Sequence, residues 1–328
     1  MRTRTTPAGT PAGAVAVARK RKGQPIHGWL VLDKPEGITS TQALSKVRWL
    51  LNAEKGGHGG TLDPLASGVL PIALGEATKT VSYAMDGSKT YRFAVRWGEQ
   101  TTTDDREGPV IARSDLRPDA AAIRAALPAF LGDIDQVPPQ FSAIKIDGER
   151  AYDLARGGEE VELASRRVRI DRFELVEQPD ADSAVFEVDC GKGTYIRSLA
   201  RDLALHLGTV AHVTLLRRLK VGAFTLERSI SLDDLAAMEQ GAAVERLLLP
   251  IETALDDIPA LALTEAEAHR LRHGQTVALL TRQDRERLSA LHGSVGEDGA
   301  VIALFAGKPV ALVRVEGAEV RPVRVLNL

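Results

Sequence analysis

The chain has 328 residues, with 44% hydrophobic and 26% charged side chains, which is typical of a soluble globular protein. At roughly 150 residues per domain, this length predicts about two domains. No apolar run approaches the roughly 20 residues of a membrane-spanning helix, and no signal-peptide core is recognisable. The single cysteine, Cys190, excludes an internal disulfide and a cysteine-rich zinc site. We therefore expect a cytoplasmic protein with no membrane contact.

Charge is distributed unevenly along the chain. The formal net charge is −2, yet residues 1–22 contain six basic residues and no acidic residue, so the remainder carries −8. Residues 1–24 contain no aromatic residue and are rich in Thr, Pro, Ala and Gly, which predicts a disordered basic tail. Residues 191–220 hold six basic residues against one acidic residue, for +5. Such a patch can contact RNA phosphates, although a solvated helix face explains it equally well on charge alone.

The folded part begins with a short apolar strand and a Lys-Pro-x-Gly turn in residues 27–37, followed by a helix that Thr39 or Ser40 caps. Residues 56–70 come next, with five glycines among the first thirteen positions and one carboxylate, Asp63, before a proline. Glycine permits positive φ and proline fixes φ, so we expect a tight loop that presents a single acid. Apolar runs on both sides favour a functional loop over a solvated turn.

The middle of the chain mixes strand and helix patterns. Apolar and charged residues alternate in residues 89–97, which predicts a half-buried strand. The next predicted elements are an Ala-rich helix, two hairpin strands, a helix that Gly208 closes and a strand or strand-turn, in residues 118–131, 168–176, 184–190, 196–207 and 213–224.

The pattern changes near residues 256–259. Thr264 and Glu267 have the spacing of a capping box, and short strands with glycine turns follow. A small helix with several short strands in about 65 residues predicts a compact, barrel-like module. We therefore divide the chain into a tail, a main domain and a C-terminal module, in residues 1–24, 25–257 and 258–328.

Several motifs, in order along residues 27–224, together resemble one family. The stretch Gly57-His58-Gly59-Gly60-Thr61-Leu62-Asp63-Pro64 resembles the catalytic loop of the TruB family, the tRNA pseudouridine-55 synthases. The other motifs are Leu32-Asp33-Lys34-Pro35-x-Gly37-x-x-Ser40, Lys89-x-Tyr91-Arg92, Pro138-Pro139-x-x-Ser142-Ala143-x-Lys145, Arg150-Ala151-Tyr152-x-Leu154-Ala155-Arg156, Gly193-Thr194-Tyr195-Ile196-Arg197-Ser198-Leu199 and Ala211-His212-Val213-x-x-Leu216-Arg217-Arg218. The C-terminal residues are similar, more loosely, to a PUA RNA-binding module.

The resemblance implies an α+β fold with a mixed, largely antiparallel central sheet, flanking helices and a small β-barrel-like PUA domain. Residues 138–167 would correspond to the family's thumb, which closes over the tRNA. The implied reaction isomerises a uridine in the T-arm loop of tRNA, at position 55, to pseudouridine. The base is flipped out, its glycosidic bond is broken and a C–C bond forms at C5. Neither a cofactor nor a metal is implied.

The resemblance also assigns roles to individual residues. It implies that Asp63, Tyr91 and Arg197 are catalytic, with the Arg197 guanidinium holding the Asp63 carboxylate. Tyr91 packs against the target base and is a candidate for moving a proton. Tyr195 and Leu216 line the uracil pocket. In the same comparison, His58 fills the space that the flipped base leaves in the RNA loop.

Several alternatives stay open at this point. Asp63 attacks C6 of the uracil or C1′ of the ribose, or assists elimination. The chain could instead be a tRNA-binding or folding protein in which modification is secondary, although retention of both Asp63 and Arg197 favours intact chemistry. A guide-RNA-dependent relative is disfavoured by residues 150–156, which resemble the stand-alone bacterial enzymes. No protein partner is implied, and the absence of a coiled-coil pattern favours a monomer.

Overall fold

The structure is a computed structural model that describes residues 23–141, 145–146, 149–150, 163–238, 242–256, 258–291 and 299–328. The predicted tail, residues 1–24, lies almost wholly outside these ranges, and so does much of the predicted thumb, residues 138–167. Within the described ranges, every helix is too short or too polar to cross a membrane.

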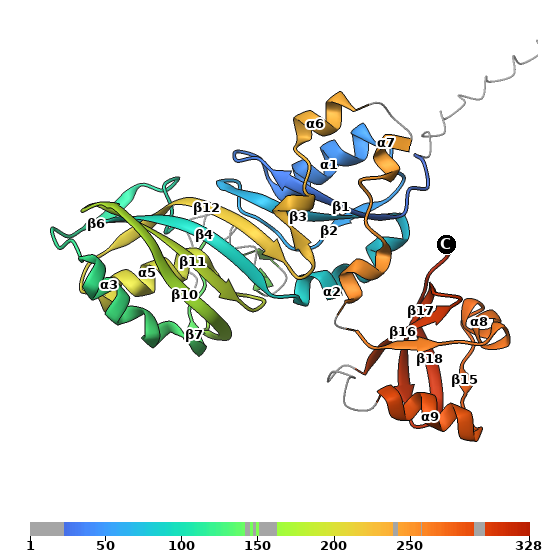
Figure 1. Cartoon of the computed structure of the whole chain (residues 1–328). Helices are drawn as coiled ribbons and strands as arrows, with labels where there is room; N and C mark the ends of the chain where they lie inside the picture. Colours follow the sequence, from blue (N-terminus) through green and yellow to red (C-terminus); the bar gives the residue numbers. More distant parts are fainter. Residues whose placement is uncertain are drawn as a thin grey trace, which may run out of the picture.

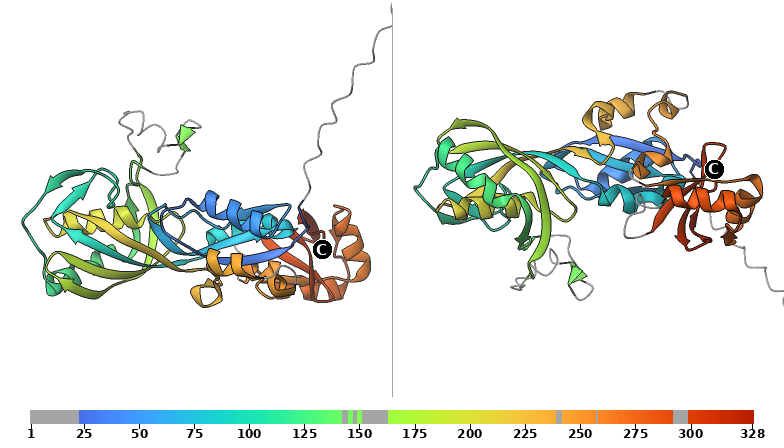
Figure 2. Two further views of the ribbon diagram at one scale, coloured as in Figure 1. Left: turned by 90° about the horizontal axis from the view of Figure 1, so that it is seen from above. Right: turned by 60° about the horizontal axis from the view of Figure 1, so that its bottom comes forward.

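A nine-stranded sheet runs along the long axis of the main domain (Figures 1 and 2). Its order is β1-β3-β12-β4-β11-β10-β7, with β2 beside β3 and β13 beside β12. All neighbours are antiparallel except β3 and β12. The prediction of a mixed, largely antiparallel sheet is therefore confirmed. The strands are β1 Gly28–Lys34, β2 Gly56–His58, β3 Ala66–Leu74, β4 Lys89–Trp97, β7 Gly132–Gln136, β10 Arg166–Asp180, β11 Ser183–Cys190, β12 Ala211–Val221 and β13 Phe224–Thr225.

Helices and short hairpins flank this sheet. The helices and 3-10 turns of the main domain are α1 Ser40–Leu50, η1 Gly75–Thr80, α2 Val81–Asp86, α3 Ala120–Ala126, η2 Leu127–Phe130, α5 Ile196–His206, η3 Leu226–Arg228, α6 Leu232–Ala237, α7 Ala242–Glu245 and η4 Ile251–Leu255. The hairpins are β5 Glu99–Thr101 with β6 Val110–Arg113, and β8 Lys145–Ile146 with β9 Glu149–Arg150. The expected helix over residues 118–131 changes to a 3-10 turn at residue 127, because Pro128 lacks a backbone donor.

Strands β1 and β3 are buried on both faces. Alternate residues, such as Leu30 and Leu70, face the main core with α1 and α5, whereas Trp29 and Val69 face a second core under η1, α2 and η4. This explains why β3 is a nearly continuous apolar run rather than an alternating one. The loop that precedes β3 is therefore anchored to a strand that both cores hold.

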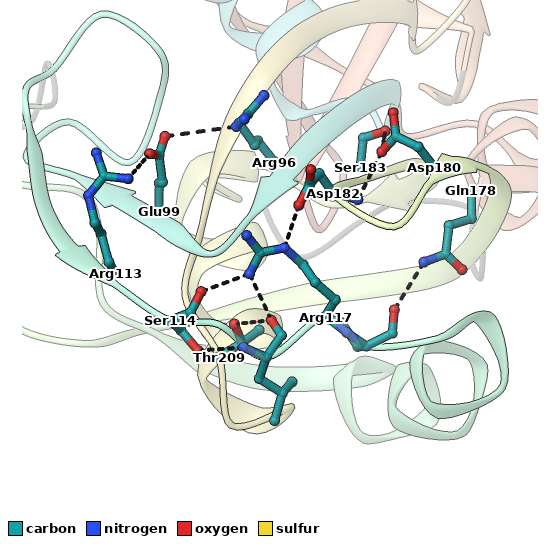
Figure 3. Close-up of polar contacts among 12 residues, drawn as sticks. Arg96, Glu99, Arg113, Ser114, Arg117, Gln178, Asp180, Asp182, Ser183 and Thr209 are labelled. Carbon is teal, nitrogen blue, oxygen red and sulfur yellow. Dashed lines mark hydrogen bonds and ion pairs between the residues drawn. The ribbon is translucent and has the colours of Figure 1, made fainter.

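A polar network lies near β6 and α3, at the end of the main domain away from the C-terminal module (Figures 1 and 3). The Arg117 guanidinium bonds Asp182 at 2.5 Å and the carbonyl of Ser114 at 2.7 Å. It also lies against Gly98, where a Cβ would come within 2.2 Å of Arg117 Nη1. Thr209 donates to the carbonyl of Leu116. These contacts tie together the connections between β4 and β5, β10 and β11, and α5 and β12.

The C-terminal module is a curled five-stranded sheet covered by two helices, and it lies beside α2 (Figure 1). Thr264 and Glu267 form the predicted capping box of the first helix. In chain order the elements are β14 Ala260–Ala262, α8 Glu265–Arg272, β15 Val277–Ala278, α9 Arg282–Leu291, β16 Ala300–Phe305, β17 Lys308–Glu316 and β18 Glu319–Val325. The sheet order is β14-β16-β17-β18-β15.

Candidate active site

The loop that carries Asp63 is fastened to the start of α1. The Thr39 side chain caps the helix with Gln42, which leaves the next hydroxyl, Ser40, free for another contact. The Leu62 amide donates to Ser40 Oγ at 2.8 Å, and Ser40 Oγ donates to the Leu62 carbonyl at 3.1 Å. Because both groups are buried, this reciprocal pair satisfies the backbone directly before Asp63.

A buried lysine holds the other side of the same loop. Lys34 Nζ donates to the carbonyls of Pro35 and Ile38 at 2.8 Å and to that of Pro64 at 3.4 Å. The Gly37 amide donates to the same Pro64 carbonyl at 2.8 Å. Burial lowers the pKa of Lys34 to about 8, although the nearby Asp63 carboxylate opposes this shift. The Lys-Pro-x-Gly turn therefore supports Pro64, directly after Asp63, while Ser40 supports Leu62, directly before it.

Five of the six predicted site residues line one cavity of about 440 Å³, a volume in the range of small-ligand sites. They are Asp63, Tyr91, Tyr195, Arg197 and Leu216. The walls come from the Asp63 loop, β4, β12 and the segment that leads into α5. Gln136 fixes that segment, because its side chain accepts from the Tyr195 amide at 2.8 Å and donates to the Tyr195 carbonyl at 3.1 Å.

His58 is the predicted residue that does not line this cavity. It lies in β2, opposite Ile72 of β3, and is half-buried. Its Nδ1 is buried and has no hydrogen-bond partner among the described residues. Burial lowers the pKa of His58, and the positive charge of Arg218 adds to the effect. The neutral imidazole is thus favoured, and a contact of His58 with the RNA loop stays a prediction.

Arg197 is buried beneath Asp63 and contacts it directly. Arg197 Nη2 lies 2.9 Å from Asp63 Oδ2, and 4% of the Arg197 side chain is exposed against 35% for Asp63. The same guanidinium donates to the carbonyls of Thr103 and Phe141, each at 2.9 Å. Its Nη1 lies 3.5 Å from Oδ2 of a second carboxylate, Asp105, which is buried. The guanidinium is therefore fixed on several sides and offers one edge to the cavity.

The polar loop between β5 and β6 supplies Asp105, a residue that the sequence reading did not single out. Oδ1 of Asp105 accepts from the Thr103 hydroxyl and from the Glu107 amide, at 2.5 and 3.0 Å. Its neighbour Asp104 pairs with Arg201 on the next turn of α5, at 3.0 Å. Burial raises the pKa of Asp104, and Arg201 counteracts that rise. Two adjacent acids thus engage two arginines one helical turn apart.

Arg218 forms the floor between the loop and β4. It is 1% exposed, and it donates to the carbonyls of Val69, Gly60 and Thr61 at 2.8, 3.1 and 3.4 Å. Gly68, opposite Arg218 in the parallel pair, has φ +102°, and a Cβ there would lie 2.2 Å from the Arg218 carbonyl oxygen. The sequence reading gave Arg218 no role, although it stands in the Leu-Arg-Arg motif beside Leu216.

Tyr91 lies against Arg218 in the same cavity. Burial raises the pKa of the Tyr91 hydroxyl, and interaction with Arg218 reduces the rise. The phenol therefore keeps its proton at neutral pH. Lys89, two residues earlier on β4, donates to the carbonyls of Met85 and Gly87, and burial lowers its pKa to about 8. Lys89 thus fixes the end of α2, which forms the opposite wall.

The cavity brings together the Asp63 carboxylate, the buried Arg197 guanidinium that contacts it, the protonated phenol of Tyr91 and apolar surface. This set can stack a planar base, hold a carboxylate in a fixed direction and donate hydrogen bonds. In the described part of the chain, no three His, Cys, Asp or Glu side chains are placed to hold a metal ion.

Comparison with known proteins identifies the class. Residues 48–196 match the family described as "TruB family pseudouridylate synthase (N terminal domain)", and residues 197–256 match the "tRNA pseudouridylate synthase B C-terminal domain". The chain therefore belongs to the TruB family of pseudouridylate synthases, as its motifs indicate.

Named relatives agree with this assignment, and a solved structure has a similar fold. A protein of Rhodospirillum rubrum named tRNA pseudouridine synthase B is 57% identical over 312 residues, covering 95% of this chain and 100% of its own length. A Caulobacter vibrioides protein of the same name is 52% identical over 312 residues, with the same coverage. A chain in the crystal structure of a Cbf5-Nop10-Gar1 complex matches with a TM-score of 0.70 and 26% identity, over 92% of this chain and 85% of its own.

Proposed function

We propose that this protein isomerises one uridine in the T-arm loop of tRNA, at position 55, to pseudouridine. The proposal rests on the contact of 2.9 Å between the Asp63 carboxylate and the Arg197 guanidinium. Both residues line the same cavity as Tyr91. Membership of the TruB family and the names of the curated relatives support both the reaction and the tRNA substrate.

In the proposed reaction the target uridine leaves its stack and enters the cavity, at a cost of a few kcal/mol. Stacking on aromatic rings such as Tyr91 and Tyr195 offsets this cost by about 1–3 kcal/mol per base. The bond between N1 and C1′ breaks, the uracil turns and C5 bonds to C1′; C5 then loses its proton and N1 gains one, so the product is an isomer of the substrate. Asp63 is the group that meets the base or the sugar, through attack at C6 or C1′ or by assisting elimination.

The surrounding charges suit a nucleotide with its flanking phosphates. Lys192 lines the same cavity as Asp63 and is exposed, whereas Lys89 and Arg218 are buried there and bond backbone carbonyls. An exposed cation such as Lys192 positions a nucleic-acid backbone without reading its sequence. The proposal therefore takes RNA shape and splayed loop bases as the features that the protein recognises.

We further propose that the protein acts as a cytoplasmic monomer without a cofactor, and that its C-terminal module contacts a second part of the tRNA. The same set of surfaces would also serve a tRNA-folding role in which modification is secondary.

The test is to incubate purified protein with an unmodified tRNA transcript and to map pseudouridine along the RNA. The expected result is one new site in the T-arm loop with the wild-type protein and none with Asp63→Asn. A new site elsewhere would contradict the proposed target. Modification by Asp63→Asn would contradict the proposed role of the carboxylate. Binding and refolding of tRNA without any modification would favour the folding role.

A further inference from the structure

Glu76, in η1 of the main domain, bonds the last described residues of the C-terminal module. Glu76 Oε2 accepts from the Asn327 amide at 2.8 Å and from Lys79 Nζ at 2.6 Å. Lys79 Nζ also donates to the Val325 carbonyl at 2.6 Å. Burial alone opposes ionisation of Glu76, but its hydrogen bonds with Lys79 and Asn327 lower its pKa below the ordinary value. Figure 1 shows the chain end, marked C, returning from β18 toward the main domain.

The residue between these two backbone contacts is buried in the main domain. Leu326 is 3% exposed and packs in the second core with Ala77, Ala84 and Trp29. Three consecutive residues, 325–327, are thus held in turn by a hydrogen bond to a backbone carbonyl, an apolar contact and a hydrogen bond from a backbone amide. We call this set of contacts, made by Glu76, Lys79 and residues 325–327, the clasp.

The segment that holds the clasp also reaches the active-site cavity. In α2, which follows η1 directly, Tyr83 packs against a cluster that includes Ile302 and Leu312 of the module. Two residues further on, Met85 and Asp86 line the cavity that contains Asp63. One short segment therefore contacts the module on one side and forms a wall of the cavity on the other.

Exposed cations of the module lie in a recess beside the clasp. Arg272 and Lys308 of the module are exposed, and they line a recess of about 330 Å³ together with His27 and Glu252 of the main domain. His27 accepts from the Glu76 amide at 3.1 Å, so this recess adjoins the clasp. Exposed Arg and Lys side chains are the usual contacts for RNA phosphates.

We propose that Glu76 is a positioning residue that fixes the C-terminal module at a set distance from the cavity, so that one tRNA contacts both parts at once. This inference rests on the proposed function, because it takes tRNA as the substrate. Two linked binding surfaces raise each other's effective concentration only when their geometry fits the partner. Loosening the clasp should therefore weaken the binding of whole tRNA and leave the binding of an isolated T-arm hairpin unaffected.

The experiment compares full-length tRNA transcript with a T-arm stem–loop, measuring kcat, KM and binding affinity for each with the full-length protein. Glu76→Ala removes both bonds, whereas Glu76→Gln keeps one neutral acceptor. Asp182→Asn is the matched control. It removes the charge of a carboxylate that lies 2.5 Å from Arg117 Nε, in the polar network away from the clasp (Figure 3).

We expect Glu76→Ala to raise KM and Kd for full-length tRNA by about five- to tenfold. This is part of the affinity that two linked binding surfaces gain over one surface alone. Its kcat, and all values for the hairpin, should stay within about twofold; Glu76→Gln should be intermediate and Asp182→Asn unchanged. Amide hydrogen exchange at Asn327 should be faster in Glu76→Ala, which tests the clasp without RNA. Equal losses on both RNAs, or no loss on tRNA, would overturn the inference. Wild-type protein that modifies neither RNA would refute the proposed function instead, and the binding and exchange comparisons would still decide on the clasp.

Discussion

Replacing Asp105 by asparagine tests how strongly the buried carboxylate controls Arg197. The substitution keeps the size of the side chain and an oxygen that accepts from the Glu107 amide, but it replaces the charged oxygen that faces the guanidinium by an uncharged NH2 group. Both partners of this pair are 4% exposed, and breaking a buried pair costs about 3–5 kcal/mol. Because the atoms are 3.5 Å apart and Arg197 keeps Asp63, we expect the lower figure, about 3 kcal/mol, in the free energy of unfolding.

The effect on catalysis follows from the position of the guanidinium. A displacement of about 1 Å in a catalytic group can cost about 10²-fold in rate, so we expect a loss of that order in the single-turnover rate. The assay is release of tritium from tRNA labelled at C5 of uridine, since C5 loses its hydrogen when the new bond forms. Asp104→Asn is the matched control, because Asp104 pairs with Arg201 at 3.0 Å and does not contact Arg197 in this way. A folded Asp105→Asn protein with the wild-type rate, or an equal rate loss in Asp104→Asn, would refute the reasoning.

Three further predictions concern the Asp63 loop. Asp63→Asn should abolish modification while tRNA binding stays within about tenfold, as seen by filter binding, because the carboxylate serves chemistry more than affinity. Ser40→Ala leaves the amide and carbonyl of Leu62 buried without partners, so urea unfolding should show a loss of about 2 kcal/mol, and an unchanged midpoint would argue against the tether. Lys34 has a pKa of about 8 in the folded protein against an ordinary value of 10.5, so the unfolded chain binds more protons between these values and stability rises with pH across that window. From pH 7 to 9.5 this gain is about 2 kcal/mol, and Lys34→Met should lack it.

The fold could be predicted from the sequence wherever a periodic pattern acts alone. The strand over residues 89–97 coincides with β4, because its alternation reflects one buried and one exposed face. The helix expected at residues 118–131 is shorter, since Pro128 interrupts the backbone hydrogen bonds. The strand β10 extends to Asp180, beyond its expected end at residue 176, because its pairing with β11 continues through irregular registers that local patterns do not encode.

The candidate site was predictable only in part. Resemblance to the TruB motifs singled out Asp63, Tyr91 and Arg197, which the structure brings to one cavity, but no local pattern distinguishes Asp105 from other acids in a polar loop. Its importance comes from the packing of that loop against α5, which brings it to Arg197. Arg218 was overlooked for a similar reason: a basic residue in a strand predicts exposure, whereas here three backbone carbonyls pair with it in the interior.

The single parallel pairing in the large sheet has a consequence for synthesis of the protein. Ser67 and Arg217, which bond across β3 and β12, are 150 residues apart in the chain. At about 5–20 residues per second, a ribosome needs roughly 8 to 30 s to extend the chain from one to the other. Strands β1 and β3 with α1 can assemble during that time, but Arg218 and Leu216 cannot yet reach the Asp63 loop. A nascent chain that ends before β12 therefore has Asp63 but lacks Arg218, which holds the backbone of the Asp63 loop. The complete site thus forms only once the main domain is nearly complete.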